Sequence, residues 1–231
     1  MTAHKEIAAV LTDIEGTTTS ISFVYDILFP YAAARLDDYC RRPDSEPELA
    51  AALARLRQEQ AEEGDGADLA GYARRLMAED RKSTGLKLLQ GVIWEEGYLN
   101  GTIQGHVFPD VPGALADWRA AGRRLRVFSS GSVHAQKLLF GHTAYGDLTP
   151  LFEGFHDTTT GHKREATAYA AIAAAYGLQA GEILYLSDVR KELDAAASAG
   201  MRTGLLVRPG NRPAEPGGHA VYRDFTEVGL G

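Results

Sequence analysis

Apolar and polar positions alternate in blocks along the second half of the chain. Short apolar runs, each the length of a buried strand, are separated by longer amphipathic or Ala-rich stretches that favour helices. The pattern predicts strands at residues 7–12, 125–128, 154–156, 183–186 and 203–207, and helices at residues 111–122, 132–140, 163–176 and 190–199. Because right-handed crossovers between parallel strands place helices on both faces, this order predicts an α/β fold with a doubly wound (Rossmann-like) parallel sheet.

Between the first predicted strand and residue 109, Ala, Arg, Glu and Leu dominate the sequence. The pattern there predicts helices at residues 24–40, 47–63, 69–84 and 86–96. We therefore expect an α/β core, residues 1–20 and 105–231, and a helical cap domain, residues 21–104, inserted after the first strand. Such an insert can close over the strand ends and exclude water, or it can simply add stability. The Pro- and Gly-rich residues 209–218 predict a loop, to which we assign no function.

Composition narrows the class of protein. Of the 231 residues 45% are hydrophobic, which is enough for a substantial core, and the formal net charge of -7 argues against a nucleic-acid partner. Arg123, Arg124 and Arg126 lead into a predicted strand, and we interpret them as a solvated edge. The single cysteine, Cys40, excludes an internal disulfide and is typical of a reducing compartment.

Several kinds of ligand and partner are not indicated. No apolar stretch is long enough for a transmembrane helix, and the first residues do not resemble a secretion signal. The sequence also contains no zinc-type Cys/His spacing, P-loop or G-x-G-x-x-G turn. We expect a soluble, cytoplasmic protein without a membrane partner, and a monomer, because no sequence feature demands a partner chain.

The first predicted strand ends in acidic residues. Asp13 and Glu15 are two positions apart, so on an extended segment their side chains point the same way, and Gly16 permits a sharp turn after them. Strands in open α/β sheets present their functional residues at the carboxyl end. Two carboxylates at this position indicate metal and phosphate chemistry.

Polar residues also follow other predicted elements of the core. Ser129 and Ser130 follow the second strand, Asp188 follows the fourth, and Lys163 opens the long Ala-rich helix. Each residue alone is as typical of a turn, a helix cap or the protein surface. A cation in the first turn of a helix opposes the helix dipole, so Lys163 suggests a nearby anion. Together these residues predict a pocket for a phosphate and a divalent cation.

This set of residues resembles the haloacid dehalogenase-like phosphohydrolases. Their first motif, D-x-[DE]-G-T, is present as DIEGT at residues 13–17. The second motif matches Ser129, the third matches Lys163, and the fourth matches Asp188 with Glu192 four residues later. All four motifs occur in the order that is typical of the family.

Longer phrases resemble one branch of these enzymes, the enolase-phosphatase E1 family of methionine salvage. The phrases are DIEGTT at residues 13–18, GVIWEEGY at 91–98, FSSGS at 128–132 and DTTTGHK at 157–163. The second phrase is the most specific, because the insert differs between branches of the superfamily. Glu15 replaces the commoner second aspartate, which is also typical of this branch. The resemblance spans nearly the whole chain.

The resemblance implies a nucleophile, a metal and a proton carrier. Asp13 would attack the phosphorus to give an aspartyl-phosphate that water hydrolyses. Mg²⁺ would be held by the carboxylates of Asp13 and Asp188 and by the main-chain carbonyl of Glu15. The side chain of Glu15 would protonate the leaving oxygen and then activate water. The base of the enolisation step stays open, with Glu15 as the candidate.

The resemblance also implies how the phosphoryl group is bound. Ser129, Ser130 and Lys163 would hold its oxygens. Glu192 would orient Lys163 or the metal shell. Asp194 either shares that role or lies on a solvated helix face.

The implied activity is that of acireductone synthase. This bifunctional enzyme enolises the small phosphorylated diketone 2,3-diketo-5-methylthiopentyl 1-phosphate and then hydrolyses its phosphate ester, giving 1,2-dihydroxy-3-keto-5-methylthiopentene. Ile93, Trp94 and Tyr98 either line a pocket for the methylthio group or form the core of the insert. Two alternatives stay open: a related phosphatase for another small phosphate ester, such as a sugar phosphate or phosphoglycolate, and a non-catalytic module that binds a phosphorylated ligand.

Overall fold

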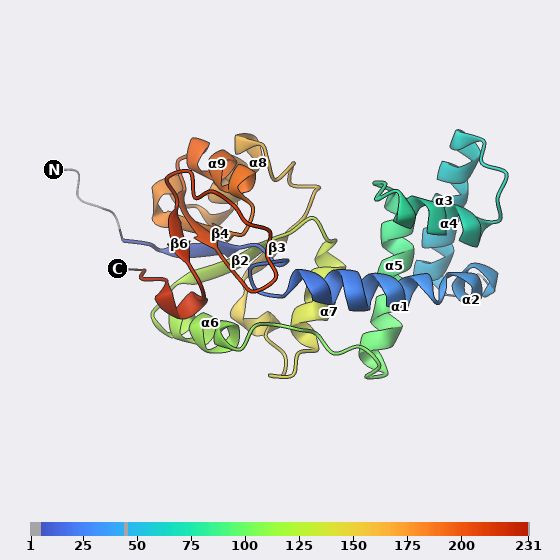
Figure 1. Cartoon of the computed structure of the whole chain (residues 1–231), viewed down its shortest axis with the longest axis horizontal. Coiled ribbons are helices and arrows are strands. Elements are labelled where there is room, and N and C mark those ends of the chain that lie inside the picture. Colours follow the sequence, from blue (N-terminus) through green and yellow to red (C-terminus); the bar gives the residue numbers. More distant parts are fainter. Residues whose placement is uncertain (1–5, 44–45, 231) are drawn as a thin grey trace. The chain divides into compact units, whose positions relative to one another are not determined.

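The computed structural model describes residues 6–43 and 46–230, which form two compact units (Figure 1). The first unit contains the described residues up to Phe23 and those from Gly105 onward. The second unit is Val24–Gln104. Each unit buries its own set of apolar side chains, so each is described separately.

The first unit is built on a six-stranded parallel sheet with the order β3-β2-β1-β4-β5-β6. Its strands are β1 (Ala9–Thr12), β2 (Arg124–Phe128), β3 (Gly154–His156), β4 (Ile183–Ser187), β5 (Arg202–Leu206) and β6 (Ala220–Tyr222). β1 pairs with β2 on one side and with β4 on the other, which places Val10 opposite both Leu125 and Leu184. The strand order reverses at β1 and β4, where doubly wound sheets open a crevice at the carboxyl ends. The predicted α/β class and doubly wound sheet are confirmed.

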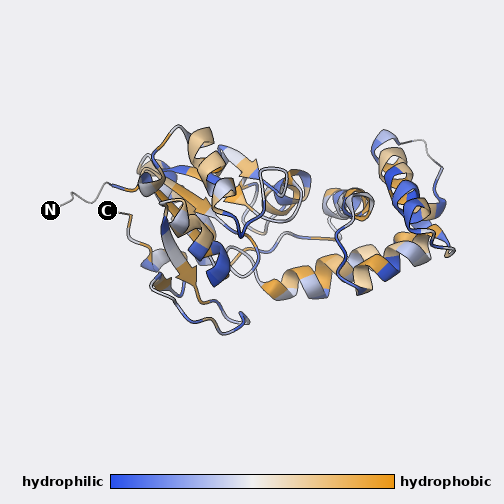
Figure 2. Cartoon of the chain, turned by 90° about the horizontal axis from the view of Figure 1, so that it is seen from above, coloured by the Kyte–Doolittle hydropathy of each residue, from blue (hydrophilic) through white to orange (hydrophobic). Residues whose placement is uncertain are grey.

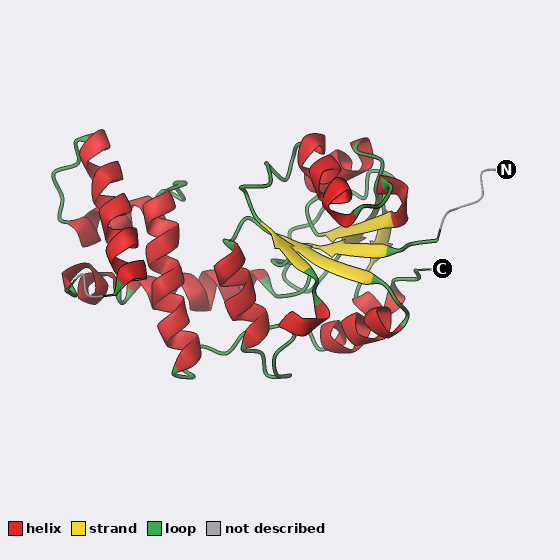
Figure 3. Ribbon diagram, turned by 180° about the vertical axis from the view of Figure 1, so that it is seen from behind, coloured by secondary structure: helices red, strands yellow, loops and turns green. Residues whose placement is uncertain are grey.

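Helices cover both faces of this sheet (Figure 3). In the described part of the unit, α8 (Ala166–Tyr176) and α9 (Arg190–Ser198) lie on one face, and α6 (Asp110–Ala120) and α7 (Val133–Gly141) on the other. β1 and β4 are buried along their whole length, and the sheet is largely orange in Figure 2, as expected for parallel strands covered on both faces. Leu11, Phe128 and Tyr185 from the sheet pack with Tyr169 and Ile172 from α8 in one buried cluster.

Two details of this unit differ from the prediction. β6 and the short 3-10 helix Phe225–Glu227 were not predicted, because β6 is a three-residue, largely exposed edge strand without an alternating pattern. α8 begins at Ala166 instead of residue 163, because Glu165 has extended backbone angles and precedes the helix as its N-cap. Lys163 therefore lies in the turn before α8, and its predicted place in the first helical turn was wrong. Residues 209–218 form a loop, as predicted.

The second unit is helical. Its elements are a π-helical segment (Phe23–Leu28), which begins at the last residue of the first unit, and α1 (Phe29–Ala33), α2 (Leu36–Arg41), α3 (Pro47–Glu63), α4 (Leu69–Ala78) and α5 (Thr84–Leu99). The side chains of Asp68 and Ser83 cap α4 and α5 by accepting hydrogen bonds from main-chain N–H groups in the first turns. None of the helices among the described residues is long and apolar enough to cross a membrane.

Two predicted helices of this unit are interrupted. The helix predicted at residues 24–40 is divided into the π-helical segment, α1 and α2; Pro30 lacks the N–H that an α-helix would donate to residue 26. The helix predicted at residues 69–84 ends at Ala78, and Asp80 has a φ of 50°, the left-handed conformation that often follows a helix.

The aromatic phrase of α5 lies inside the helical unit. Ile93, Trp94 and Tyr98 are buried. Trp94 donates its indole N–H to the main-chain oxygen of Leu28 at 2.8 Å, and its ring stacks on Phe29. These contacts favour the interpretation of the three side chains as the core of the insert.

Candidate active site

Three neighbouring strands bring predicted site residues to one edge of the sheet. Ser129 follows β2, Asp13 follows β1 and Asp188 follows β4, and these strands are adjacent in the sheet. The Asp13 N–H donates to the main-chain oxygen of Leu186 at 2.9 Å, which extends the β1–β4 pairing to the residue that carries the carboxylate. Strand pairing therefore unites side chains that are far apart in the sequence.

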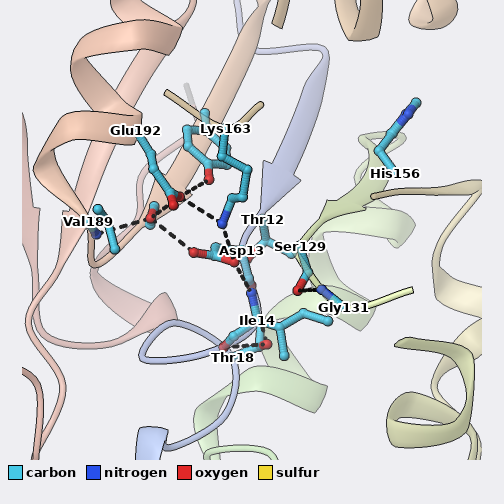
Figure 4. Close-up of polar contacts among 12 residues, drawn as sticks. Thr12, Asp13, Ile14, Thr18, Ser129, Gly131, His156, Lys163, Val189 and Glu192 are labelled. Carbon is cyan, nitrogen blue, oxygen red and sulfur yellow. Dashed lines mark hydrogen bonds and ion pairs between the residues drawn. The ribbon is translucent and has the colours of Figure 1, made fainter. Parts of the chain in front are cut away.

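A buried ion-pair network joins Asp13, Lys163 and Glu192 (Figure 4). Lys163 Nζ lies 2.7 Å from Asp13 Oδ1 and 2.7 Å from Glu192 Oε2. The Lys163 side chain is only 7% exposed. Burial alone lowers the pKa of Lys163, but the charges of Asp13 and Glu192 outweigh it and raise that pKa above its ordinary value. The third motif thus supplies a fixed cation beside the predicted nucleophile.

Two hydroxyl groups complete this network. Ser187 Oγ lies 3.1 Å from Asp13 Oδ2 and 3.1 Å from Glu192 Oε2, and Tyr185 donates its hydroxyl to Glu192 Oε2 at 2.9 Å. Ser187 has one hydroxyl proton, so it can donate to only one carboxylate at a time. Burial, and then the charge of Asp13, raise the pKa of Glu192. The orientation of Asp13 is therefore set by groups on both of its oxygens.

The turn after β1 brings the first and fourth motifs together. Gly16 has a φ of 68°, a conformation that favours glycine. A methyl group on Gly16 would lie 2.3 Å from Asp188 Oδ2, so it would displace the carboxylate of the fourth motif. Glu15, which precedes this glycine, is half-buried. The glycine is required here by both the conformation and the space.

The residues after β2 form a turn that leads into α7. Ser129 is buried, and its Oγ accepts a hydrogen bond from the Gly131 N–H at 3.2 Å (Figure 4). Ser130 is exposed, and Ser132 caps α7 by accepting from the Ala135 N–H. The predicted phosphate-binding residues therefore directly precede a helix N-terminus, where main-chain N–H groups favour an anion.

The charges at this edge of the sheet fit a divalent cation. The carboxylates of Asp13, Asp188 and Glu192 accompany the ammonium of Lys163. Burial, and then the charges of Asp13 and Glu192, raise the pKa of Asp188 to about 7. Among the residues that the structure describes, no group of three or more His, Cys, Asp or Glu side chains is arranged to hold a metal. The predicted Mg²⁺ site does not require three such side chains, because its ligands are two carboxylates and the main-chain oxygen of Glu15. All three are oxygen donors that suit Mg²⁺.

Asp194 and Arg126 lie outside this network. Asp194 is on the exposed face of α9, where it pairs with Arg190 at 3.6 Å and with His219 at 3.0 Å. It therefore lies on a solvated helix face and does not orient Lys163. Arg126, predicted at a solvated edge, is mostly buried instead, because it pairs with Glu153 at 2.9 Å and lies over the Tyr176 ring.

Two residues that hold the turn after β1 were not predicted from the sequence. Arg208 Nε donates to the main-chain oxygen of Thr17 at 3.0 Å, and Asn211 Nδ2 donates to that of Gly16 at 2.8 Å. Both residues follow β5, so they lie at the same carboxyl edge as Asp13. That position in the predicted sheet is the signal that identifies them.

Relatives of known class agree with this geometry. The haloacid dehalogenase-like hydrolase family matches residues 7–200. Enolase-phosphatase E1 of Pseudomonas aeruginosa strain UCBPP-PA14 is 52% identical over 223 residues, which are 96% of this chain and 98% of that protein. Enolase-phosphatase E1 of Pectobacterium atrosepticum is 54% identical over 203 residues, 87% of this chain and 89% of that protein.

Solved structures share the architecture. The crystal structure of the UTR4 protein of Saccharomyces cerevisiae aligns with a TM-score of 0.81 and 36% identity, covering 96% of this chain and 100% of that one. CbbY from Rhodobacter sphaeroides, solved in complex with phosphate, aligns with a TM-score of 0.64 and 16% identity over 96% of each chain, which shows a common fold. The chain belongs to the haloacid dehalogenase-like hydrolases and, among them, to the enolase-phosphatase E1 family.

Proposed function

We propose that this protein enolises 2,3-diketo-5-methylthiopentyl 1-phosphate and then hydrolyses its phosphate ester to 1,2-dihydroxy-3-keto-5-methylthiopentene, the acireductone of methionine salvage. The relatives are named for these two activities. The observation that carries the proposal is the buried Asp13 carboxylate at the carboxyl end of β1, 2.7 Å from the Lys163 ammonium. This is the arrangement that an in-line attack on a phosphate ester needs.

In the hydrolytic step, Asp13 acts as the nucleophile. One of its oxygens attacks the phosphorus, the bond between phosphorus and the ester oxygen breaks, and an aspartyl-phosphate and the enol product result. Water then attacks the same phosphorus, which releases inorganic phosphate and regenerates the carboxylate. Lys163 stabilises the charge on the phosphoryl oxygens, and its second contact, with Glu192, holds it in place before the substrate arrives.

Ser129, Ser130 and Lys163 bind the phosphoryl group. Support comes from the turn after β2, where Ser129 is buried next to the start of α7 and Ser130 is exposed to an incoming ligand. Hydroxyl and main-chain N–H donors beside a fixed ammonium suit a dianionic phosphate.

Haloacid dehalogenase-like phosphatases generally use a divalent metal. We propose that this ion is Mg²⁺. Its protein ligands would be the carboxylates of Asp13 and Asp188 and the main-chain carbonyl of Glu15. When bound, it supplies positive charge to the phosphoryl oxygens and polarises a substrate carbonyl. Burial, and then the nearby charges of Asp13 and Glu192, raise the pKa of Asp188 to about 7, and this accumulation of negative charge supports a cation at this point.

The Glu15 side chain carries the protons. It protonates the oxygen that leaves phosphorus and then takes a proton from the attacking water. It is also the candidate base for the enolisation, which removes a proton from the carbon that bears the phosphate ester. Its support is its position, two residues after the nucleophile and next to the turn at which Gly16 meets Asp188.

The helical insert, residues 21–104, acts as a cap that excludes water during phosphoryl transfer. Its support is its place in the chain, directly after the strand that carries Asp13. We also propose that the partner of the protein is a small phosphorylated diketone and that it binds neither nucleic acid nor membranes. We propose that it is a monomer in the cytoplasm.

The test is Asp13→Asn, followed for ultraviolet absorbance of the enol and for free phosphate in the same reaction with Mg²⁺. Phosphate release should be abolished, whereas some enolisation should persist because it does not need the nucleophile. Asp194→Asn, which changes an exposed acid of the same unit, is the matched control and should behave as the parent. Release of phosphate by Asp13→Asn at the parent rate would mean that the nucleophile is misassigned.

The same assay separates the two alternatives. Faster phosphate release from phosphoglycolate or a sugar phosphate than from the diketone phosphate would indicate a related phosphatase of different specificity. No hydrolysis of any of these esters with Mg²⁺ present would indicate a binding module.

A further inference from the structure

Asn211 lies in the loop after β5 and directs its side chain at the turn after β1. Its Nδ2 donates to the main-chain oxygen of Gly16 at 2.8 Å and to that of Leu206 at 3.2 Å. Both partners are carbonyl oxygens, so the nitrogen must face them and the amide orientation is fixed. Asn211 Oδ1, on the other side of the amide, is buried and has no hydrogen-bond partner within the described residues.

The unsatisfied Oδ1 shares a narrow space with Asp188. A methyl group on Gly16 would lie 3.0 Å from Asn211 Oδ1 and 2.3 Å from Asp188 Oδ2. The two oxygens therefore border the same position beside Gly16. A buried acceptor without a donor is unfavourable, so Asn211 Oδ1 favours a bound ligand that brings a hydrogen-bond donor to this edge of the sheet.

The loop that carries Asn211 is itself anchored. The Asn211 N–H donates to the main-chain oxygen of Arg208 at 3.1 Å, and Arg208 holds the next carbonyl of the turn, that of Thr17, while its guanidinium pairs with Asp110. One loop thus fixes two consecutive carbonyl groups of the turn. Of the two anchors, only Asn211 places an unpaired acceptor next to Asp188.

We propose that Asn211 is a positioning residue for the cation site, a proposal that rests on the proposed function of Asp13, Glu15 and Asp188. Its amide donates to the Gly16 carbonyl and so steadies the positive-φ turn that directly follows the Glu15 main-chain oxygen. Its Oδ1 is left as an acceptor for a donor that arrives with the bound ion. Outer groups of this kind commonly change metal affinity by about 10-fold or more.

The test is Asn211→Ala, with the thermal unfolding midpoint measured as a function of Mg²⁺ concentration. A ligand that binds only the folded state raises the midpoint, so the titration reports affinity without any catalysis. We expect the half-saturating Mg²⁺ concentration to rise about 10-fold. Phosphate release should show the same shift in Mg²⁺ dependence, with the substrate KM at saturating Mg²⁺ unchanged. The control is Asn100→Ala, which changes the other, exposed asparagine of the chain.

A purely structural role predicts a different result. It would lower the midpoint in the absence of Mg²⁺ and leave the half-saturating concentration equal to that of Asn100→Ala, and this outcome would overturn the proposal. If Asn211→Ala does not fold, Asn211→Ser removes the same amide, keeps a residue common in turns, and is subject to the same criterion. A parent protein whose midpoint does not respond to Mg²⁺ would refute the cation site, and this proposal with it, before any variant is compared.

Discussion

A buried ion-pair network in one unit of the molecule differs from a solvated ion pair in the other. In the α/β unit, Lys163 is 7% exposed and pairs with two buried carboxylates. In the helical unit, Arg81 and Glu63 form a pair with side chains that are 43% and 31% exposed. Charges are costly to remove from water unless they are fully matched, whereas exposed pairs contribute little. Stability alone therefore does not explain why the buried network is present, whereas a catalytic role does. The surface pair requires no such explanation.

A second buried ion pair of the α/β unit contacts several groups near the site. Arg208, in the α/β unit, binds both oxygens of Asp110 at 2.8 Å and the main-chain oxygen of Thr17. Asp110 also accepts from the Phe225 N–H at 2.8 Å. These buried charges thus hold several loops around the site. Loss of one of them should destabilise each loop that it contacts.

Replacing Lys163 by methionine should have the largest effect. It leaves Asp13 and Glu192 buried without their shared cation, and such a loss typically costs about 3–5 kcal/mol of folding free energy. Both enolisation and phosphate release should fall, because both build negative charge near the phosphate. Urea unfolding without added metal and the coupled absorbance and phosphate assay measure the two effects.

A matched substitution for Lys163→Met is Lys191→Met. Lys191 is exposed on α9, one residue before Glu192, and we expect its loss to leave stability and both rates unchanged. If Lys163→Met were as stable and as active as Lys191→Met, the buried network would have no more importance than the surface pairs. The comparison between the units would then fail.

The sequence predicted the parts of the α/β unit that depend on local pattern. β1 and β4 are continuous apolar runs that end in Asp13 and Asp188, so both the strands and the edge at which they meet follow from the residues. The start of α8 could not be predicted, because it depends on the extended backbone of Glu165, whereas the residue types at 163–165, Lys-Arg-Glu, are all compatible with a helix. The contact of Asn211 with Gly16 joins residues from two distant loops, and no local pattern encodes it.

A smaller effect is expected from pH, and it should arise from the α/β unit. His106 Nδ1 accepts from the Ser20 N–H at 3.3 Å and lies 2.8 Å from Thr19 Oγ1, so this nitrogen carries no proton. Burial lowers the pKa of His106 below 6.5. The unfolded chain therefore binds a proton at higher pH than the folded protein does, and the contribution of His106 to stability, present above pH 6.5, is lost as the pH falls below it.

The measurement is urea unfolding of the parent and of His106→Asn across this pH range, in parallel. The stability of the parent relative to the variant should fall as the pH falls, because an amide oxygen can accept from Ser20 without titrating. Asp188, whose pKa is raised to about 7, titrates in both proteins and cancels in this difference. The helical unit, residues 24–104, contains no histidine, so it offers no competing histidine titration in this range. Identical pH profiles for the two proteins would remove His106 as a source of the dependence.

The smallest effect should follow from Arg81→Ala in the helical unit. Arg81 Nη2 lies 2.6 Å from Glu63 Oε1, and Arg75 is a second partner of the same carboxylate, so Glu63 keeps a cation nearby after the change. Because the pair is solvated, water replaces the lost contact, and neither the urea midpoint nor phosphate release should change measurably. A clear loss of stability would show that surface pairs contribute to this unit as buried ones do to the other. A loss of phosphate release at unchanged stability would instead mean that Arg81 contributes to catalysis. The exposure of its side chain argues against such a role.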